Sequence, residues 1–324
     1  MRAFPPLSVL LSLVIILSGV GTTQVVVNNS ASVRSSTSFD YILIIIMENH
    51  PLNYTTNTAG VIGNPSAPFI NLLAKNYSLA TNYFSLAGGS LPNYIALTDA
   101  DLTSVNGSCT VPGPKCRTTA INIVDRVESS GRTWKAYMED YSGGCDGTGS
   151  PLYAADHNPF IFYTDITSNN TRCSHIVSAN PGGTGFPDSQ LISDLSSRQS
   201  APNYMWLTPN NCDNMHGTGN GACSSNLVAN GDGYLSQLVP EIFKSTIFRT
   251  QRAALFVVFD EPSGCTYNTC PVPAIWAGPV IKPNYVSKTL YTHYSLLTTL
   301  EHIWAFPPLT TNDQTSTSMT EFFP

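Results

Sequence analysis

Short, unbroken apolar runs recur along the chain, and segments that suit helices lie between them. Runs rich in β-branched and aromatic residues predict strands over 41–47, 133–138, 203–208, 254–260 and 273–278. Helices are expected over 65–76, 91–100, 118–131, 233–245 and 293–304. Because strands that are covered on both faces read as continuous apolar runs, this alternation predicts an α/β/α sandwich around a mostly parallel central sheet.

Polar side chains stand where three of these strands end. The first strand, "YILIIIM", runs directly into Glu48, Asn49 and His50, and the strand "ALFVVF" runs into Asp260 and Glu261. The strand "NYMWL" is followed by Asn210, Asn211, Asp213 and His216. Ligands of open α/β sheets bind beyond the carboxyl ends of the strands, and clusters of oxygen ligands suit a divalent cation. Each group also has a plainer explanation, as a turn, a cap or a solvated loop.

A serine that could act as a nucleophile lies in "LAGGSLPNYIAL". Ser90 follows two glycines and precedes Pro92, which is expected in the first turn of a helix. The free N–H groups at a helix N-terminus favour phosphate oxygens, and glycines allow a ligand to approach the backbone closely. The alternative is that Ser90 only caps the helix.

The first residues predict an exported protein. Arg2, an apolar run over 7–17 and small residues after it form the layout of a signal peptide, predicted here over 1–23. A retained membrane anchor is the alternative. Residues 24–39 are Ser-rich and polar, so we expect a disordered lead-in, and 40–324 are predicted to form a single domain.

Cysteine and charge content agree with export. The chain has 8 cysteines, and in an exported protein an even number predicts disulfides, with sequential pairing as the simplest arrangement. They lie in long loops over 101–117, 140–175 and 209–232 and near residue 265, and no CxxC spacing indicates zinc. Sequons at Asn28, Asn53, Asn76, Asn106 and Asn169 fit a glycoprotein. Charged residues are 11% of the chain, the net charge is −6, and no Lys/Arg cluster exists, which argues against a nucleic-acid partner.

An ordered set of motifs resembles a known family. "MENHPLNY", "GGSLPNYIALT", "DHNPFIFY", "TPNNCDNMHG", "VVFDEPSG" and "YTHYSLLTTLEHIW" are similar to motifs of the phosphoesterase family that contains bacterial acid phosphatases and phospholipases C. The resemblance extends from about residue 40 to residue 305. It implies an alkaline-phosphatase-like fold.

The resemblance also implies roles for individual residues. Glu48, Asn49, Asp260 and Glu261 match positions that bind one divalent metal ion, whose identity the motifs do not specify. Ser90 matches the nucleophile that becomes phosphorylated. His157 and His216 match histidines that contact the phosphoryl group or protonate the leaving group, and Asp213 matches their polar support. Two departures from the family pattern are Asp156, where a second histidine is common, and Glu261, where some members have aspartate.

The predicted function is therefore that of a secreted, metal-dependent acid phosphatase that hydrolyses phosphomonoesters through a phosphoserine. A phospholipase C is the alternative, and it would need an apolar cleft, for which 160–163 and 204–206 are candidate linings unless they are core. A disulfide-stapled binding protein without catalysis is a second alternative. The expected partner is a small phosphorylated substrate or a phospholipid, with membrane contact only for a phospholipase or a retained N-terminal segment.

Overall fold

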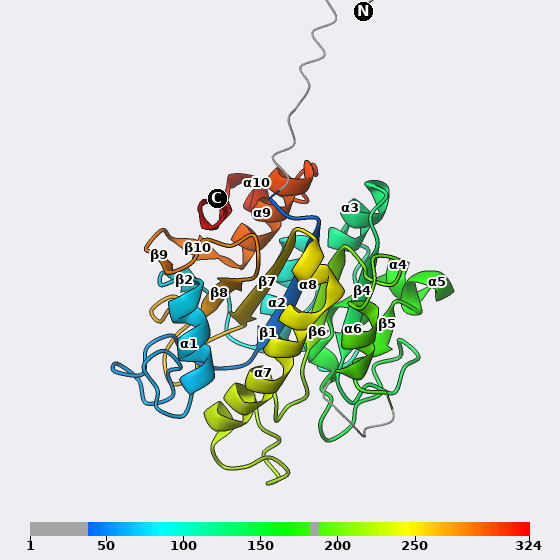
Figure 1. The fold of residues 1–324 in the computed structure, drawn as a ribbon. Helices are drawn as coiled ribbons and strands as arrows, with labels where there is room; N and C mark the ends of the chain where they lie inside the picture. The colour runs from blue at the N-terminus through cyan, green and yellow to red at the C-terminus, as the bar shows by residue number, and fades with distance from the viewer. Residues whose placement is uncertain (1–37, 182–187) are drawn as a thin grey trace, which may run out of the picture. The chain divides into compact units, whose positions relative to one another are not determined.

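The computed structural model describes residues 38–181 and 188–324, and an eight-stranded sheet lies at the centre of this part of the chain (Figure 1). The strand order is β5 (Ile176–Ser178), β4 (Trp134–Met138), β6 (Tyr204–Thr208), β1 (Tyr41–Met47), β7 (Ala253–Phe259), β8 (Ala274–Ala277), β2 (Ser78–Ala80) and β9 (Tyr285–Ser287). All neighbours pair in parallel except β8, which is antiparallel to both β7 and β2. A separate parallel pair joins β3 (Tyr83–Phe84) to β10 (Tyr291–Thr292).

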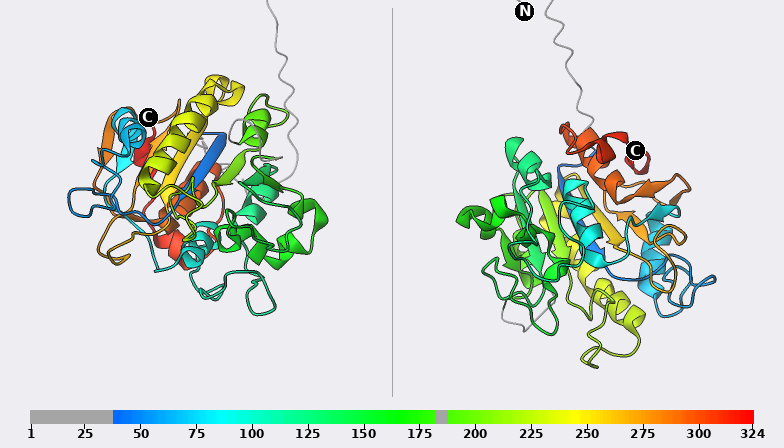
Figure 2. Two further views of the ribbon diagram at one scale, coloured as in Figure 1. Left: turned by 90° about the horizontal axis from the view of Figure 1, so that it is seen from below. Right: turned by 180° about the vertical axis from the view of Figure 1, so that it is seen from behind.

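Helices cover both faces of the sheet. Figures 1 and 2 show α1 (Pro68–Asn76), α7 (Leu227–Lys244) and α8 (Thr246–Thr250) on one face, and α2 (Ser90–Asp99) and α9 (His293–Trp304) on the other. The remaining helices are α3 (Ile123–Ser129), α4 (Thr164–Thr167), α5 (Asn170–Cys173), α6 (Ser189–Asp194), α10 (Thr311–Thr315) and the 3₁₀ turns η1 (Ala155–His157), η2 (Pro159–Phe162) and η3 (Thr320–Phe322). Since every residue of β1 and β7 is buried, their unbroken apolar runs are explained by cover on both faces.

The predicted α/β/α sandwich is therefore confirmed, with differences at the edges. The β8 strand runs antiparallel, and α7 begins at Leu227 rather than at residue 233. The strands β2, β5 and β9 have three residues each, which is too short for a readable pattern. The predicted signal peptide over 1–23 and all but the last two residues of the lead-in over 24–39 lie outside the described residues. The predicted domain limits 40–324 stay a prediction.

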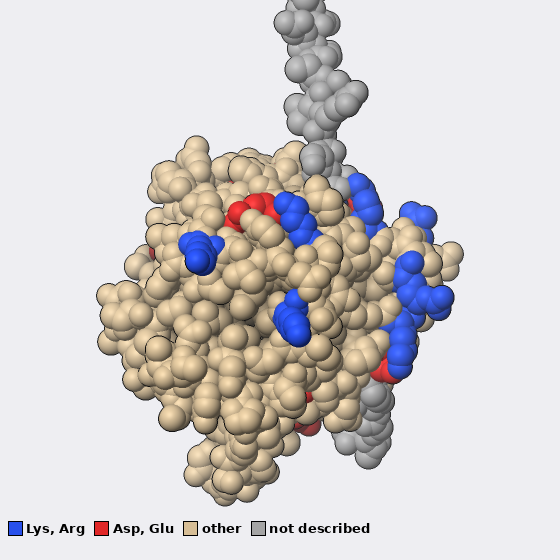
Figure 3. All heavy atoms as spheres, turned by 60° about the vertical axis from the view of Figure 1, so that its left-hand side comes forward, with Lys and Arg blue, Asp and Glu red and all other residues tan. Residues whose placement is uncertain are grey.

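Four disulfides close the long loops. They join Cys109 to Cys116, Cys145 to Cys173, Cys212 to Cys223 and Cys265 to Cys270, as sequential pairing predicted. Such usage is typical of oxidising compartments. Figure 3 shows a face on which most atoms belong to uncharged residues. Among the residues that the structure describes, no helix is long and apolar enough to cross a bilayer.

The register of β1 and β7 determines which residues meet at the carboxyl edge of the sheet. Met47, the last residue of β1, pairs with Phe259, the last residue of β7. The residues that follow, Glu48 and Asp260, therefore leave the sheet side by side at its carboxyl edge.

Candidate active site

Glu48 is the centre of a buried polar cluster beyond this edge. Its side chain is fully buried, and its backbone N–H donates to the Asn214 carbonyl at 2.8 Å. The next residue, Asn49, adopts a left-handed conformation with φ 48°, which asparagine tolerates better than most residues. The turn directs the Asn49 N–H to Oδ1 of Asp260, at 3.1 Å. The abrupt end of the apolar strand thus holds two acidic side chains together.

Ser90 is the first residue of α2 and faces Glu48. Its hydroxyl donates to Oε2 of Glu48 at 3.0 Å. Gly89 precedes the helix with φ 95°, a conformation that glycine adopts without strain, and its N–H donates to Oε2 of Glu261 at 2.7 Å. The N-cap position belongs to Gly89, and the Ser90 hydroxyl bonds to Glu48, so these contacts do not support the alternative that Ser90 only caps the helix.

Tyr94 completes the surroundings of Glu48, and sequence reasoning missed it. The buried Tyr94 hydroxyl donates to Oε1 of Glu48 at 2.5 Å. Its ring also stacks on His157, with centroids 5.5 Å apart and 8° between the planes. Tyr94 lies four residues after Ser90 in the same helix, a spacing that puts both on one face. The four-residue spacing from Ser90 could therefore have identified Tyr94 as a site residue from the sequence.

The two predicted histidines lie on the far side of the same carboxylate. Nε2 of His157 is 3.5 Å from Oε1 of Glu48, and the rings of His157 and His216 are 5.1 Å apart. Glu48, His157 and His216 each offer a ligand atom within 4.8 Å of the others, which is a spacing that could hold a metal ion. His157 is buried and His216 is exposed. The structure thus brings both histidines to Glu48.

Burial dominates the electrostatics of the cluster. Burial, together with the nearby Asp260, raises the pKa of Glu48 well above its usual range. Burial and the charge of Glu261 raise the pKa of Asp260 to about 7. Burial, with His216 adding to it, lowers the pKa of His157 to about 3. His157 is therefore neutral at the pH of most assays, and its contact with Glu48 is not an ion pair.

The residues present fit a divalent cation. Two buried carboxylates lie together, and neither Oδ1 of Asn49 nor Oδ2 of Asp260 has a hydrogen-bond partner, although both are buried. Buried oxygens of this kind are expected to meet a cation, because leaving them unpaired is costly. The sequence predicted Glu48, Asn49, Asp260 and Glu261 as ligands. The three side chains whose ligand atoms lie within 4.8 Å of one another are instead Glu48 and the two histidines. Glu48 belongs to both sets.

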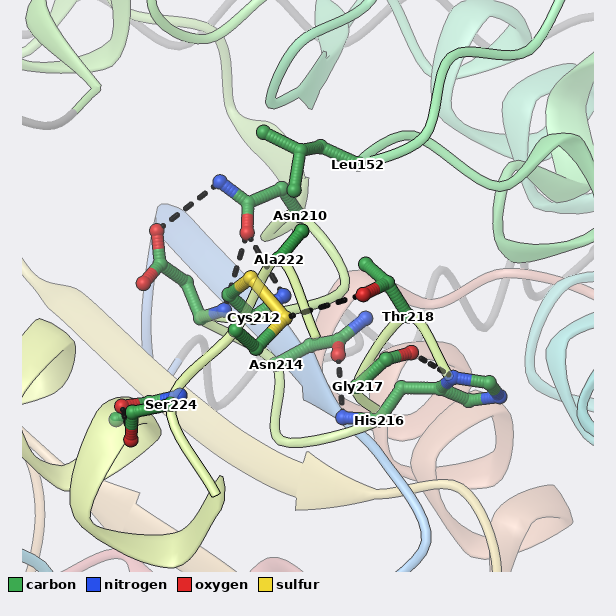
Figure 4. Close-up of a disulfide and its surroundings, with 12 residues drawn as sticks. Leu152, Asn210, Cys212, Asn214, His216, Gly217, Thr218, Ala222 and Ser224 are labelled. Atoms are coloured by element: carbon green, nitrogen blue, oxygen red, sulfur yellow. Dashed lines mark hydrogen bonds between the residues drawn. A yellow bond between two sulfur atoms is a disulfide. The ribbon is translucent and has the colours of Figure 1, made fainter. Parts of the chain in front are cut away.

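Asp213 does not make the contacts that the sequence suggested. Its carboxylate accepts a hydrogen bond from Asn210 at 3.1 Å and lies against Glu139, where burial raises its pKa. Its hydrogen bonds thus lead to a neighbouring acidic cluster and not to His157 or His216. Met215, which lies between Asp213 and His216, has φ 80°, a value that is uncommon outside glycine. His216 instead directs Nδ1 to the carbonyl of Gly217 at 2.7 Å (Figure 4).

Two other histidines support the loops. Nδ1 of His50 lies 2.6 Å from the Ala59 carbonyl, so this side chain holds its own loop. His293 is buried, with Nε2 2.7 Å from the Asp260 carbonyl and Nδ1 3.1 Å from the Tyr83 hydroxyl. Through its contact with the carbonyl, His293 holds the backbone of Asp260 in place.

The chain is similar in sequence to two phosphatases of known name. The chain is 26% identical over 272 residues to a phosphatidylinositol-3-phosphatase of Mycobacterium tuberculosis, covering 83% of this chain and 78% of that protein. It is 29% identical to a phosphate-repressible acid phosphatase of Penicillium chrysogenum, covering 74% of this chain but only 55% of that protein.

Solved structures agree on the fold. A protein of the alkaline phosphatase superfamily from Vibrio parahaemolyticus has a TM-score of 0.57 at 15% identity and covers 82% of this chain and 66% of its own. A putative sulfatase from Bacteroides thetaiotaomicron has a TM-score of 0.59 at 12% identity, with coverage of 87% and 74%. The model of the Phosphoesterase family matches residues 47–307, which include every residue of the site described above, and the chain therefore belongs to the Phosphoesterase family.

Proposed function

We propose that this chain is a secreted, divalent-metal-dependent phosphatase that hydrolyses phosphomonoesters in acid through a phosphoserine at Ser90. The observation that carries the proposal is the hydrogen bond from the Ser90 hydroxyl to Glu48 at the N-terminus of α2. The first backbone N–H groups of a helix have no partner within the helix, and such groups favour phosphoryl oxygens. The family match and the two relatives named as phosphatases support phosphoester chemistry.

Each side chain of the site has a role that its position suggests. Glu48 accepts the hydrogen bond of the Ser90 hydroxyl and would take its proton as Oγ attacks phosphorus, while the bond from phosphorus to the leaving oxygen breaks. His216, which is exposed and whose ring lies 5.1 Å from that of His157, would donate a proton to the leaving oxygen. Water then hydrolyses the phosphoserine. His157, which is neutral and held by Tyr94, would contact a phosphoryl oxygen.

A cation would be held at Glu48, with Asn49 and Asp260 as the further candidates, because in this scheme the two histidines face the leaving oxygen and the phosphoryl group. When bound, it supplies positive charge that stabilises the phosphoryl group and favours an ionised serine. Glu261 has a different task in this scheme, since its bond to Gly89 fixes the turn ahead of Ser90.

The phospholipase C alternative loses its support. The segments expected to line a lipid cleft, 160–163 and 204–206, are fully buried in the core. The two relatives described above are phosphatases by name, which also favours removal of a phosphate group.

Substitution of Ser90 tests the proposal. We expect Ser90→Ala to lose at least about 1,000-fold in the hydrolysis of p-nitrophenyl phosphate, since the nucleophile is removed. Ser193→Ala, an exposed serine of α6, is the matched control and should retain wild-type rates. Full activity of Ser90→Ala would refute the assignment of Ser90 as the nucleophile. Release of diacylglycerol from phosphatidylcholine would favour the phospholipase instead.

A further inference from the structure

The loop 86–89, which leads into the first turn of α2, is held by one side chain of that helix. Asn93 is fully buried, and burying an amide is costly unless its polar atoms find partners. Its Oδ1 accepts from the backbone N–H groups of Leu86 at 3.0 Å and Ala87 at 3.2 Å. Its Nδ2 donates to the carbonyls of Ala87 and Gly89, both at 2.9 Å. The full hydrogen-bonding capacity of the Asn93 amide is therefore spent on this loop.

Gly89, the last residue of the loop, is held through both of its backbone polar groups. Its carbonyl accepts from Asn93, and its N–H donates to Oε2 of Glu261 at 2.7 Å. The Gly89 carbonyl belongs to the same peptide group as the N–H of Ser90. Asn93 therefore fixes the backbone directly ahead of the hydroxyl that donates to Glu48.

The same contacts set the direction of two backbone N–H groups. In a planar trans peptide, the carbonyl and the N–H point in opposite directions. The Ala87 and Gly89 carbonyls point to the Asn93 amide, so the N–H groups in the same two peptides point away from it. These are the N–H groups of Gly88 and Ser90, and neither meets a hydrogen-bond acceptor within the described part of the chain. Both are free to bind an oxygen of a phosphoryl group that reaches Ser90.

We infer that Asn93 is a positioning residue for phosphoryl transfer, which holds the loop 86–89 so that the Ser90 hydroxyl and the two free N–H groups meet the same phosphoryl group. The inference rests on the phosphatase function proposed above. Asn93 is buried behind the loop and acts on the reaction only through it. The alternative is a purely structural role, in which the loss of Asn93 lowers stability but leaves the kinetics of the folded enzyme unchanged.

Removal of the amide separates these two roles. Asn93→Ala loses all four hydrogen bonds, and we expect kcat/KM for p-nitrophenyl phosphate to fall about 100-fold, as a displacement of about 1 Å can produce. The inhibition constant of vanadate, whose trigonal-bipyramidal form resembles the transition state, should rise by a similar factor. The inhibition constant of inorganic phosphate should rise by about 10-fold or less, because phosphate binds without the attack of the hydroxyl. Circular dichroism defines the temperature at which each variant is folded, and rates are measured below it.

Asn122→Ala is the matched control. Asn122 is also fully buried, and its Oδ1 accepts from the Val124 N–H at 3.0 Å at the start of α3. Its loss should lower stability, because a helix cap is removed, but should leave kcat/KM and both inhibition constants unchanged. If Asn93→Ala does not fold, Asn93→Asp replaces it in the same comparison, since aspartate keeps the size of the side chain and its accepting oxygen.

The outcomes separate the inference from the proposed function. If the folded Asn93 variant keeps the wild-type kcat/KM, or if it binds vanadate and phosphate with equal losses, the positioning role is wrong while the phosphatase stands. If wild-type enzyme supplied with a divalent cation hydrolyses no monoester, both fail. A loss of vanadate binding that exceeds the loss of phosphate binding, in the Asn93 variant and not in Asn122→Ala, supports the positioning role.

Discussion

Replacement of Tyr94 by phenylalanine removes one hydroxyl from the centre of the site and leaves the ring. That hydroxyl donates to Oε1 of Glu48 at 2.5 Å, in a region without solvent. The hydrogen bond lowers the pKa of Glu48 against the effects of burial and of Asp260, which raise it. Without it, the carboxylate is harder to ionise, and a proton competes better with a cation. We therefore expect Tyr94→Phe to weaken cation binding.

The magnitude follows from the type of hydrogen bond. A bond to a charged group contributes about 1.5–3 kcal/mol. At about 1.36 kcal/mol for each factor of ten, the loss corresponds to roughly 10- to 150-fold in the affinity for the cation. The assay is a titration of the cation that elemental analysis finds in the wild type, followed by calorimetry and by initial rate at pH 5.5. The loss should be smaller at pH 7.5, because fewer protons compete.

Tyr204→Phe is the matched control. Tyr204 is also fully buried, but its hydroxyl has no hydrogen-bond partner among the described residues. Its removal should leave cation affinity unchanged and should not lower the free energy of unfolding. A Tyr94→Phe protein that binds the cation within two-fold of wild type would refute the role of Tyr94, as would an equal loss in both variants.

Other parts of the chain give further predictions. Burial raises the pKa of Asp99 to about 7, so this carboxyl contributes stability that is present below pH 4 and is lost as the pH rises through 7. Between pH 4 and pH 8, wild type should lose about 2–4 kcal/mol more than Asp99→Asn in urea unfolding, and parallel curves would contradict this. Chelation should abolish activity and lower the melting temperature until a divalent cation is restored. Activity that survives exhaustive dialysis against chelator would show that catalysis does not require the cation. Replacing Cys212 and Cys223 together by serine should cost about 3 kcal/mol of unfolding free energy through loop entropy, and an unchanged denaturation midpoint would contradict that value.

The sequence predicted the acidic pair of the site because the governing physics is local. A fully apolar strand that ends in Glu48, and another that ends in Asp260, meet at one sheet edge whenever the strands are parallel and adjacent. Ser90 was found through its glycines and the following Pro92, which together mark a helix start.

Other features depend on tertiary packing and left weaker signals. Tyr94 resembles a core residue of its helix, and only its direction toward Glu48 gives it a role. Asp213 lies three positions from His216 in sequence, but the Asp213 carboxylate accepts from Asn210, whereas His216 directs Nδ1 to the Gly217 carbonyl. The strands β2, β5 and β9 are held by their neighbours in the sheet rather than by a pattern of their own.

Detection of phosphate on Ser90 tests the central proposal most directly. The enzyme would be mixed with excess p-nitrophenyl phosphate in acid, quenched within milliseconds to seconds, digested and analysed by mass spectrometry. We predict one phosphate, of +80 Da, on the peptide that contains Ser90 and none on the same peptide of Ser90→Ala. Hydrolysis at wild-type rate without any phosphorylated peptide, or with the phosphate on another residue, would contradict the proposed mechanism.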